Sequence, residues 1–158
     1  MIIRTAVVTI SDSRSSEEDI SGDTLEQLLK DFGAEIAARR LITDDVADIK
    51  AVLVELTSDD AIDLILTTGG TGLGPRDNTP EATLAVIDRE VPGIPEAMRR
   101  ETYPKTRMSM LSRGVCGVRN KTLIVNLPGS PRAVEECFAV IRPVLAHAID
   151  LISGDTRH

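Results

Sequence analysis

One segment, residues 63–80, constrains the fold more than any other part of the chain. Its sequence is Asp-Leu-Ile-Leu-Thr-Thr-Gly-Gly-Thr-Gly-Leu-Gly-Pro-Arg-Asp-Asn-Thr-Pro. Leu64–Leu66 form a short apolar run, which is typical of a buried strand in a parallel sheet. Thr79 is a favoured helix N-cap, and Pro80 suits the first position of a helix. The segment therefore predicts a buried strand, a glycine-rich loop and a helix start, which is the repeating unit of an α/β sheet.

Strand-like and helix-like patterns alternate along the rest of the chain. We expect strands at about 3–10, 36–42, 64–66, 114–118 and 121–127, and helices at about 22–32, 46–56, 80–89 and 131–152. The last two strands form a hairpin, which adds an antiparallel edge. At 158 residues the chain is long enough to fold without disulfides. The sequence predicts a three-layer α/β sandwich with a mostly parallel, mixed sheet in one domain, residues 1–158.

The glycine-rich loop is a candidate ligand site. Successive backbone N–H groups from Gly69 to Gly72 could cradle a phosphate, and Asp77 could hold a divalent cation against it. The alternative is a plain surface turn, although four glycines within six residues favour a ligand site. The loop is neither a P-loop nor a dinucleotide fingerprint, because it lacks the Lys-Ser/Thr pair of the first and the glycine spacing of the second.

Four polar loops follow the carboxyl ends of predicted strands, at residues 11–14, 43–45, 68–78 and 126–131. Ligands of open α/β sheets bind at that edge, and helix N-termini there favour anions. Of the arginines near these loops, Arg76 and Arg132 flank the glycine-containing segments, so we expect them to contact phosphates. The alternative for each is a solvated surface charge. This arrangement favours a small molecule with several phosphates.

Asp44 and Asp77 follow different strands and could both face one Mg²⁺ ion, as phosphoryl and nucleotidyl transfer usually require. The alternatives are a helix cap for Asp44 and an Asx-turn for Asp77, and Asp12 could also cap a turn. A Ser-His-Asp triad is disfavoured because His147 lies on the last predicted helix. The two cysteines and His147 lack a recognised zinc spacing.

The overall composition limits the class of partner. The chain has a formal net charge of −7 and only three aromatic residues. Nucleic-acid binding requires a basic face, and single strands are usually held by stacking, so we expect no nucleic-acid partner. Two cysteines make no disulfide framework, and no apolar run is long enough for a membrane span. The N-terminus enters a strand without a signal peptide, so we expect a cytoplasmic protein that does not bind membranes.

Several apolar side chains in the irregular segment 91–111 are difficult to place in one core. We expect them to form an apolar surface that association with other copies covers. They are Ile94, Met98, Met108, Met110 and Leu111.

A family resemblance emerges from motifs in a fixed order. These are Thr67-Thr-Gly-Gly-Thr-Gly72, Arg76-Asp-Asn-Thr-Pro-Glu-Ala-Thr83, Pro92-Gly93, Met110-Leu-Ser-Arg113 and Asn126-Leu-Pro-Gly-Ser-Pro131. Together they resemble the molybdopterin adenylyltransferase family, which includes Mog and MoaB proteins and the G domains of homologues such as gephyrin. The resemblance spans nearly the whole chain. It implies a molybdopterin-binding fold, a homotrimer, transient contacts with other molybdenum cofactor enzymes, and adenylylation of molybdopterin by Mg²⁺-ATP.

The resemblance also implies roles for individual residues. The essential, metal-binding aspartates correspond to Asp44 and Asp77. Nucleotide contacts correspond to Thr68, Gly69, Gly70, Thr71, Gly72 and Arg76. Molybdopterin contacts correspond to Ser11, Asp12, Ser13, Ser112, Asn126, Pro128, Gly129 and Ser130.

Two positions depart from the family pattern, and neither removes a charge that the chemistry needs. Ser130 stands where some relatives have Asn, and Asn78 where many have Val. The alternative function is a non-catalytic molybdopterin-binding or carrier protein of the MoaB type. Arg76 and Asp77 favour catalysis, because a pure carrier would not need them.

Overall fold

The computed structural model describes residues 1–157 and contains a six-stranded sheet in the order β2-β1-β3-β6-β5-β4. β1 pairs in parallel with β2 and β3, and β3 pairs in parallel with β6, whereas β5 is antiparallel to both β6 and β4. The predicted mixed sheet is therefore confirmed. The strands are β1 (Arg4–Ile10), β2 (Glu35–Ile42), β3 (Leu64–Thr68), β4 (Arg89–Glu90), β5 (Cys116–Arg119) and β6 (Thr122–Leu127).

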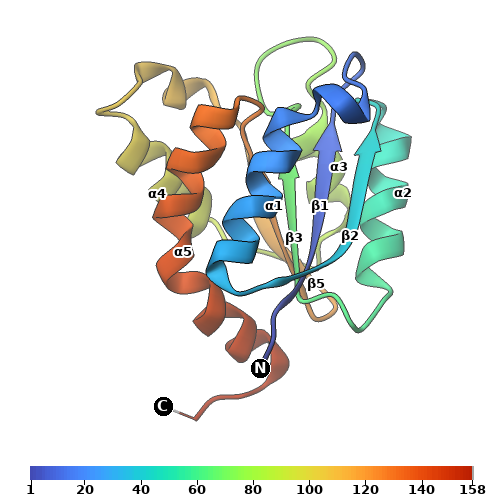
Figure 1. Ribbon diagram of the computed structural model, residues 1–158, viewed down its shortest axis with the longest axis vertical. Helices are drawn as coiled ribbons and strands as arrows, with labels where there is room; N and C mark the ends of the chain where they lie inside the picture. The colour runs from blue at the N-terminus through green and yellow to red at the C-terminus, as the bar shows by residue number, and fades with distance from the viewer. Residues whose placement is uncertain (158) are drawn as a thin grey trace.

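Helices cover both faces of this sheet and complete the predicted three layers (Figure 1). One hydrophobic cluster joins the sheet to α1, α4 and α5, and a second cluster joins its other face to α2 and α3. The helices are α1 (Ile20–Phe32), α2 (Val46–Thr57), α3 (Thr79–Val86), α4 (Gly93–Thr102) and α5 (Pro131–Ser153), with 3-10 turns η1 (Ser16–Glu18) and η2 (Arg107–Leu111).

Strand β3 shows why its sequence is apolar throughout. Leu64 and Leu66 lie in the cluster under α1 and α5, while Ile65 lies in the cluster under α2 and α3. All three side chains are fully buried because the strand is central and covered on both faces. The strand therefore anchors the glycine-rich loop that follows it.

The strand order reverses between β1 and β3. From β1 the chain passes to β2 on one side, and it then returns to β3 on the other side. The loops after these strands and after β6 all leave the same edge of the sheet, with the glycine-rich loop projecting beyond it at the top of Figure 1. Ligands bind at such a switch point in open α/β sheets, as predicted.

The cap predicted for α3 is wrong. Asn78, not Thr79, occupies the N-cap position. The Thr79 hydroxyl is fully buried and donates to the Gly69 carbonyl at 2.9 Å, so it holds the glycine-rich loop in place. Capping preference treats the chain locally and so could not reveal a partner ten residues away.

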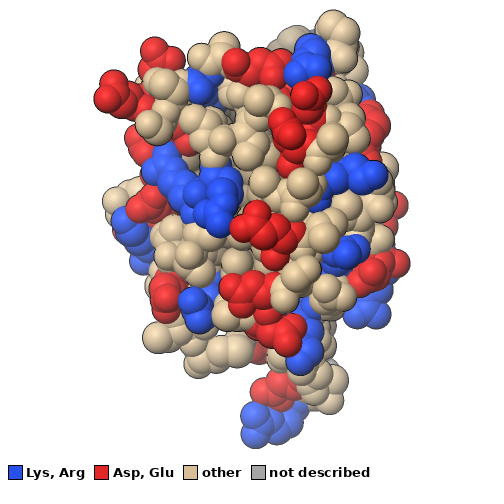
Figure 2. Space-filling model, turned by 90° about the vertical axis from the view of Figure 1, so that its right-hand side faces the viewer, with Lys and Arg blue, Asp and Glu red and all other residues tan. Residues whose placement is uncertain are grey.

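The face that carries β2 and α2 has acidic and basic side chains interspersed (Figure 2). Arg40 of β2 pairs with Glu55 of α2, and Arg39 pairs with carboxylates of α1. Within residues 1–157, no helix is both long and apolar enough to cross a membrane.

Candidate functional site

A cavity of about 470 Å³ lies between the glycine-rich loop, α4, η2 and the start of α5. Its polar side includes loop backbone and Asp77, and its apolar side includes Met98, Met108 and Leu111. We call it the glycine-loop cavity. It is lined by Gly70, Thr71, Gly72, Asp77, Pro95, Met98, Arg99, Thr102, Thr106, Met108, Ser109, Leu111, Ser112, Gly114, Asn126, Pro128, Gly129, Ser130, Ala133, Glu136 and Cys137.

Gly69 and Gly70 give the glycine-rich loop its shape. Their φ angles are +100° and +68°, in the left-handed region that other residues rarely adopt. A Cβ on Gly69 would lie 2.3 Å from the Ile10 carbonyl oxygen, and one on Gly70 would lie 2.2 Å from Thr79 Oγ1. The loop therefore passes directly over the end of β1 and against the first residue of α3, which only glycine permits.

The carbonyl groups of residues 69–72 in this loop are all hydrogen-bonded to the protein. Thr79 holds the Gly69 carbonyl through its hydroxyl and the Gly70 carbonyl through its N–H at 3.1 Å. Arg113 holds the Thr71 carbonyl through its N–H and the Gly72 carbonyl through Nε, both at 2.8 Å. By contrast, the N–H groups of residues 70–72 donate to no acceptor in the described part of the chain.

The loop between β6 and α5 repeats this arrangement. The Pro128 carbonyl accepts from the Thr68 hydroxyl at 2.7 Å. The Gly129 carbonyl accepts from the Ser21 hydroxyl at 2.5 Å and from Arg14 at 3.2 Å. No residue from 1 to 157 accepts a hydrogen bond from the N–H of residue 129 or 130.

The two loops expose unpaired backbone N–H groups beside one cavity. Within a trans peptide unit the C=O and the N–H point in opposite directions. Five carbonyls of the two loops, those of residues 69–71 and 128–129, accept hydrogen bonds from the protein. In each case the N–H of the following residue points away from the group that donates to the carbonyl. The five residues that carry these N–H groups all line the cavity. Such a convergence of unpaired N–H groups favours phosphate or carboxylate.

A group of charged residues lies beside the cavity, at the ends of β1 and β2. Asp12 accepts the backbone N–H of Asp44 at 3.0 Å, and Arg76 donates to both carboxylate oxygens of Asp12 at 2.9 and 3.0 Å. Arg76 also contacts Asp45 at 3.2 Å. The hydrogen bond from Arg76 is the main reason why the pKa of Asp12 is lowered. We call Asp12, Asp44, Asp45 and Arg76 the charged cluster.

Asp44 differs from its neighbours because no described side chain donates to its carboxylate, although the residue is only 9% exposed. Burial raises its pKa and the nearby carboxylates of Asp12 and Asp77 raise it further, whereas a hydrogen bond from the Asp12 backbone lowers it. The N-cap position of α2 belongs to Asp45, so Asp44 is not the helix cap that its sequence allowed. A Cβ on Gly70 would lie 3.1 Å from Asp44 Oδ1, which places this carboxylate against the cavity wall.

Asp77 combines a local role with a place in the cavity. Its carboxylate accepts the Gly74 N–H at 2.8 Å, three residues before it, which differs from the Asx-turn offered as an alternative because that turn uses the backbone two residues further on. It also lines the cavity and lies close enough to Asp44 to raise the pKa of that residue.

The carboxylates fit a Mg²⁺ ion that is shared with a substrate. Within residues 1–157, no three His, Cys, Asp or Glu side chains gather as a metal site. Mg²⁺ in phosphate-transfer sites is usually held by one or two carboxylates together with substrate phosphates and water. The unpaired, buried Asp44 and the neighbouring Asp77 fit that pattern.

The structure divides the predicted binding residues between the two regions. Gly70, Thr71 and Gly72, predicted for nucleotide, share one cavity with the residues predicted for molybdopterin: Ser112, Asn126, Pro128, Gly129 and Ser130. Thr68 and Gly69 hold the loops, through the Thr68 hydroxyl and through a Gly69 N–H bond to Leu127. Four predicted binding residues lie outside the cavity lining, namely Ser11, Asp12, Ser13 and Arg76. Of these, Asp12 and Arg76 belong to the charged cluster.

Two of the predicted contacts are already hydrogen-bonded within the protein. The Asn126 amide donates to Thr67 and Thr83 at 3.0 Å each and accepts from Val115, so this residue shapes the cavity floor. The Ser130 hydroxyl accepts the Ala133 N–H at 3.2 Å and caps α5.

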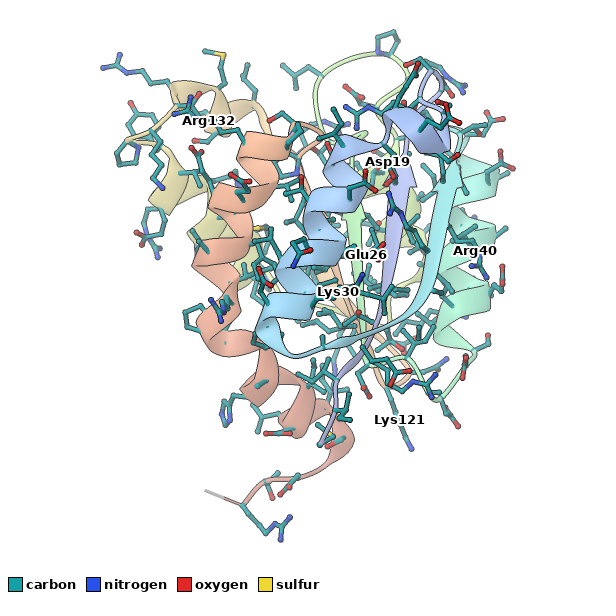
Figure 3. All side chains as sticks on the ribbon, viewed as in Figure 1. Asp19, Glu26, Lys30, Arg40, Lys121 and Arg132 are labelled. Carbon is teal, nitrogen blue, oxygen red and sulfur yellow. The ribbon has the colours of Figure 1, made fainter. Side chains whose placement is uncertain are left out.

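The arginines are distributed differently from the prediction. Arg132 lies at the same end of the molecule as Asp19 (Figure 3), but its side chain is 83% exposed and pairs with Glu136 one helical turn on. Arg113 is ion-paired with Glu81 and fastens the glycine-rich loop. Arg99 on α4 lines the cavity, and no sequence motif indicated it.

Comparison with known proteins agrees with this geometry. Residues 6–147 match the family described as a probable molybdopterin binding domain. The chain belongs to this family. The match confirms the resemblance drawn from the ordered motifs.

Three relatives illustrate the range of the family. The chain is 41% identical over 152 residues to the molybdenum cofactor synthesis protein cinnamon of Drosophila melanogaster, covering 94% of this chain but only 25% of cinnamon. It is 35% identical over 157 residues to molybdopterin adenylyltransferase of Helicobacter pylori strain J99, covering 97% and 89% of the two chains. The structure of the molybdopterin biosynthesis enzyme MoaB from Thermus thermophilus superimposes with a TM-score of 0.89 at 45% identity, covering 97% and 98%.

Proposed function

We propose that the protein is a molybdopterin adenylyltransferase of molybdenum cofactor biosynthesis. An oxygen of the terminal phosphate of molybdopterin attacks the α-phosphorus of ATP. The bond from that phosphorus to the bridging oxygen of the β-phosphate breaks, so the products are adenylyl-molybdopterin and pyrophosphate. The name and near-full-length similarity of the Helicobacter relative support this reaction.

The main support for the proposal is the pair of loops whose carbonyls are hydrogen-bonded to the protein and whose N–H groups are unpaired. The loop predicted for nucleotide and the loop predicted for molybdopterin face one cavity, as transfer between two phosphates requires. The N–H groups supply fixed positive dipoles where negative charge accumulates in the transition state. Because the loop carbonyls are already hydrogen-bonded to the protein, the loops need little reorganisation when the phosphates bind.

The chemistry requires no general base. A phosphate monoester is already anionic near neutral pH, so the protein has to align the two phosphates and neutralise their charge. This agrees with a cavity that contains glycine and hydroxyl residues and no histidine within residues 1–157.

In this proposal Asp44 and Asp77 hold Mg²⁺ together with the phosphates of ATP. The ion would neutralise charge on the α-phosphate and on the leaving pyrophosphate. Arg76 pairs with the neighbouring Asp12 and Asp45, whereas no basic side chain within residues 1–157 pairs with Asp44. Ser112 contributes its hydroxyl on the molybdopterin side.

The direct test incubates the protein with molybdopterin, Mg²⁺ and ATP and measures pyrophosphate and the adenylylated product. Formation of both in equal amounts is expected. Tight molybdopterin binding without pyrophosphate release would instead establish the carrier function. A matched reaction with a non-hydrolysable α,β-methylene ATP analogue should release nothing.

The proposal includes a cytoplasmic homotrimer that contacts other molybdenum cofactor enzymes transiently. Met98 is buried and Ile94 packs on the core, so those two residues do not contribute to the expected apolar surface. Met108, Met110 and Leu111 are 66%, 64% and 46% exposed. Their exposure supports association of copies through η2.

A further inference from the structure

Arg99 is the one basic residue among those that line the glycine-loop cavity in the described structure. It comes from α4, and its guanidinium contacts the backbone on either side of Arg113, the residue that is hydrogen-bonded to the glycine-rich loop. The remaining ionisable groups on the lining are the carboxylates Asp77 and Glu136 and the Cys137 thiol. Arg99 therefore supplies the positive side-chain charge available to a ligand in the cavity.

The guanidinium of Arg99 is held in place without being neutralised. Its Nη1 donates to the Ser112 carbonyl at 3.3 Å and to the Gly114 carbonyl at 3.0 Å. Neither Nε nor Nη2 donates to any described residue, and no described carboxylate pairs with Arg99. Carbonyls orient an arginine but leave its net charge in place, so the three N–H groups of Nε and Nη2 remain for an anion.

Other arginines near the site differ on this point. Arg76 is paired with Asp12 and Asp45, Arg113 with Glu81, and Arg132 with Glu136. Arg14 donates to Ser21 and to the Gly129 carbonyl, but it is absent from the cavity lining. In a chain with net charge −7, an unpaired, oriented cation inside a cavity indicates that its counter-charge is supplied by the ligand.

We propose that Arg99 binds a phosphate group of the substrate held in the glycine-loop cavity, together with the N–H groups of residues 70–72. The inference rests on the proposed function only in that the anion is a substrate phosphate. Arg99 then supplies the side-chain charge, and the loop supplies the backbone donors. The same contact joins ligand binding to Ser112, because Arg99 holds the Ser112 carbonyl.

The test uses inorganic pyrophosphate as the probe and the full chain as the protein. Arg99→Gln is compared with Arg100→Gln, which removes the same charge one residue away. Arg100 is exposed and pairs with its neighbour Glu101, so it is a matched control. A hydrogen bond to a charged group is strong enough for about a tenfold loss of affinity in Arg99→Gln, and Arg100→Gln should keep wild-type affinity. Equal affinities in the two variants would overturn the proposal.

Two further readouts separate anion binding from a structural role. Affinity for pyrophosphate should depend less on salt in Arg99→Gln than in wild type, because a screened charge contact has been lost. In ¹⁵N NMR of the wild-type protein, pyrophosphate should shift the Nε–H signal of Arg99, identified by its absence in Arg99→Lys. Shifts of the residue 70–72 amides with an unmoved Arg99 signal would refute the contact even if the variants misfold.

The outcome is independent of the adenylylation assay. If the wild-type protein forms no adenylylated product but pyrophosphate still shifts the Arg99 signal, the proposed function fails and the anion contact stands. If product forms at the same rate and with the same KM in Arg99→Gln and Arg100→Gln, the function stands and the Arg99 assignment fails.

Discussion

Gly69 and Gly33 form a natural pair for testing whether the glycine-rich loop is rigid. Both have positive φ, +100° and +92°. A Cβ on Gly33, at the end of α1, would meet no heavy atom within 4 Å, whereas one on Gly69 would lie 2.3 Å from the Ile10 carbonyl oxygen. Replacing each with alanine therefore imposes similar backbone strain, but only Gly69→Ala adds a steric overlap.

The expected magnitudes follow from these two contributions. A left-handed conformation costs an L-residue about 1–2 kcal/mol, and reduced freedom of the unfolded chain offsets about 0.4–1 kcal/mol of it. Gly33→Ala should therefore lower the free energy of unfolding by about 1 kcal/mol. Overpacking adds about 1–3 kcal/mol at Gly69, because Ile10 belongs to the buried strand β1 and cannot move freely.

Urea unfolding measures the difference, provided that the m-values of the two variants agree. Adenylylation activity is measured beside it. Gly69→Ala should lose transfer, because relief of the overlap displaces the N–H of Gly70, while Gly33→Ala should retain it. If both variants lose the same stability and both remain active, the loop relaxes without cost and the argument for a preorganised phosphate surface is refuted.

Other variants test the remaining assignments. Asp77→Asn should abolish transfer without a loss of melting temperature, since the Asn side chain can still accept the Gly74 N–H; near-normal turnover would remove Asp77 from the site. Asp44→Asn should also lose transfer, and urea unfolding should show no loss of stability because the Asn side chain can still accept the hydrogen bond from the Asp12 backbone; destabilisation would instead favour a structural role. Ser112→Ala should raise the KM for molybdopterin more than that for ATP, and equal changes would make Ser112 structural. Burial raises the pKa of the Cys116 thiol to about 12 and that of the Cys137 thiol to about 11, so Ellman's reagent at pH 8 should react with them only after unfolding. Light scattering should give an oligomeric mass for the wild type and a smaller one for Met110→Glu, whereas a monomeric wild type would refute association.

Five of the six strands were predictable because their signals are local, whereas the short edge strand β4 begins at Arg89, where the helix expected over 80–89 was to end. The apolar run Leu64–Leu66 marks a strand covered on both faces, and alternating segments require a mostly parallel sheet. Convergence of the polar loops at one edge follows from that topology alone. The ordered motifs then identified the family, which the match over residues 6–147 confirms. The error at Thr79 arose where a long-range contact overrode a local capping preference.

The site was less predictable because its electrostatics depend on which charges pair across the fold. Arg76 stands beside Asp77 in the sequence, yet it pairs with Asp12, which lies 64 residues away. Arg132 begins α5 beside the second loop, but it turns along the helix to Glu136. A charge that is already paired has less to offer a ligand than an unpaired one held at a cavity wall. Position in the sequence therefore indicated two arginines that are already ion-paired. Only the folded arrangement distinguishes them from Arg99, which no carboxylate within residues 1–157 pairs with.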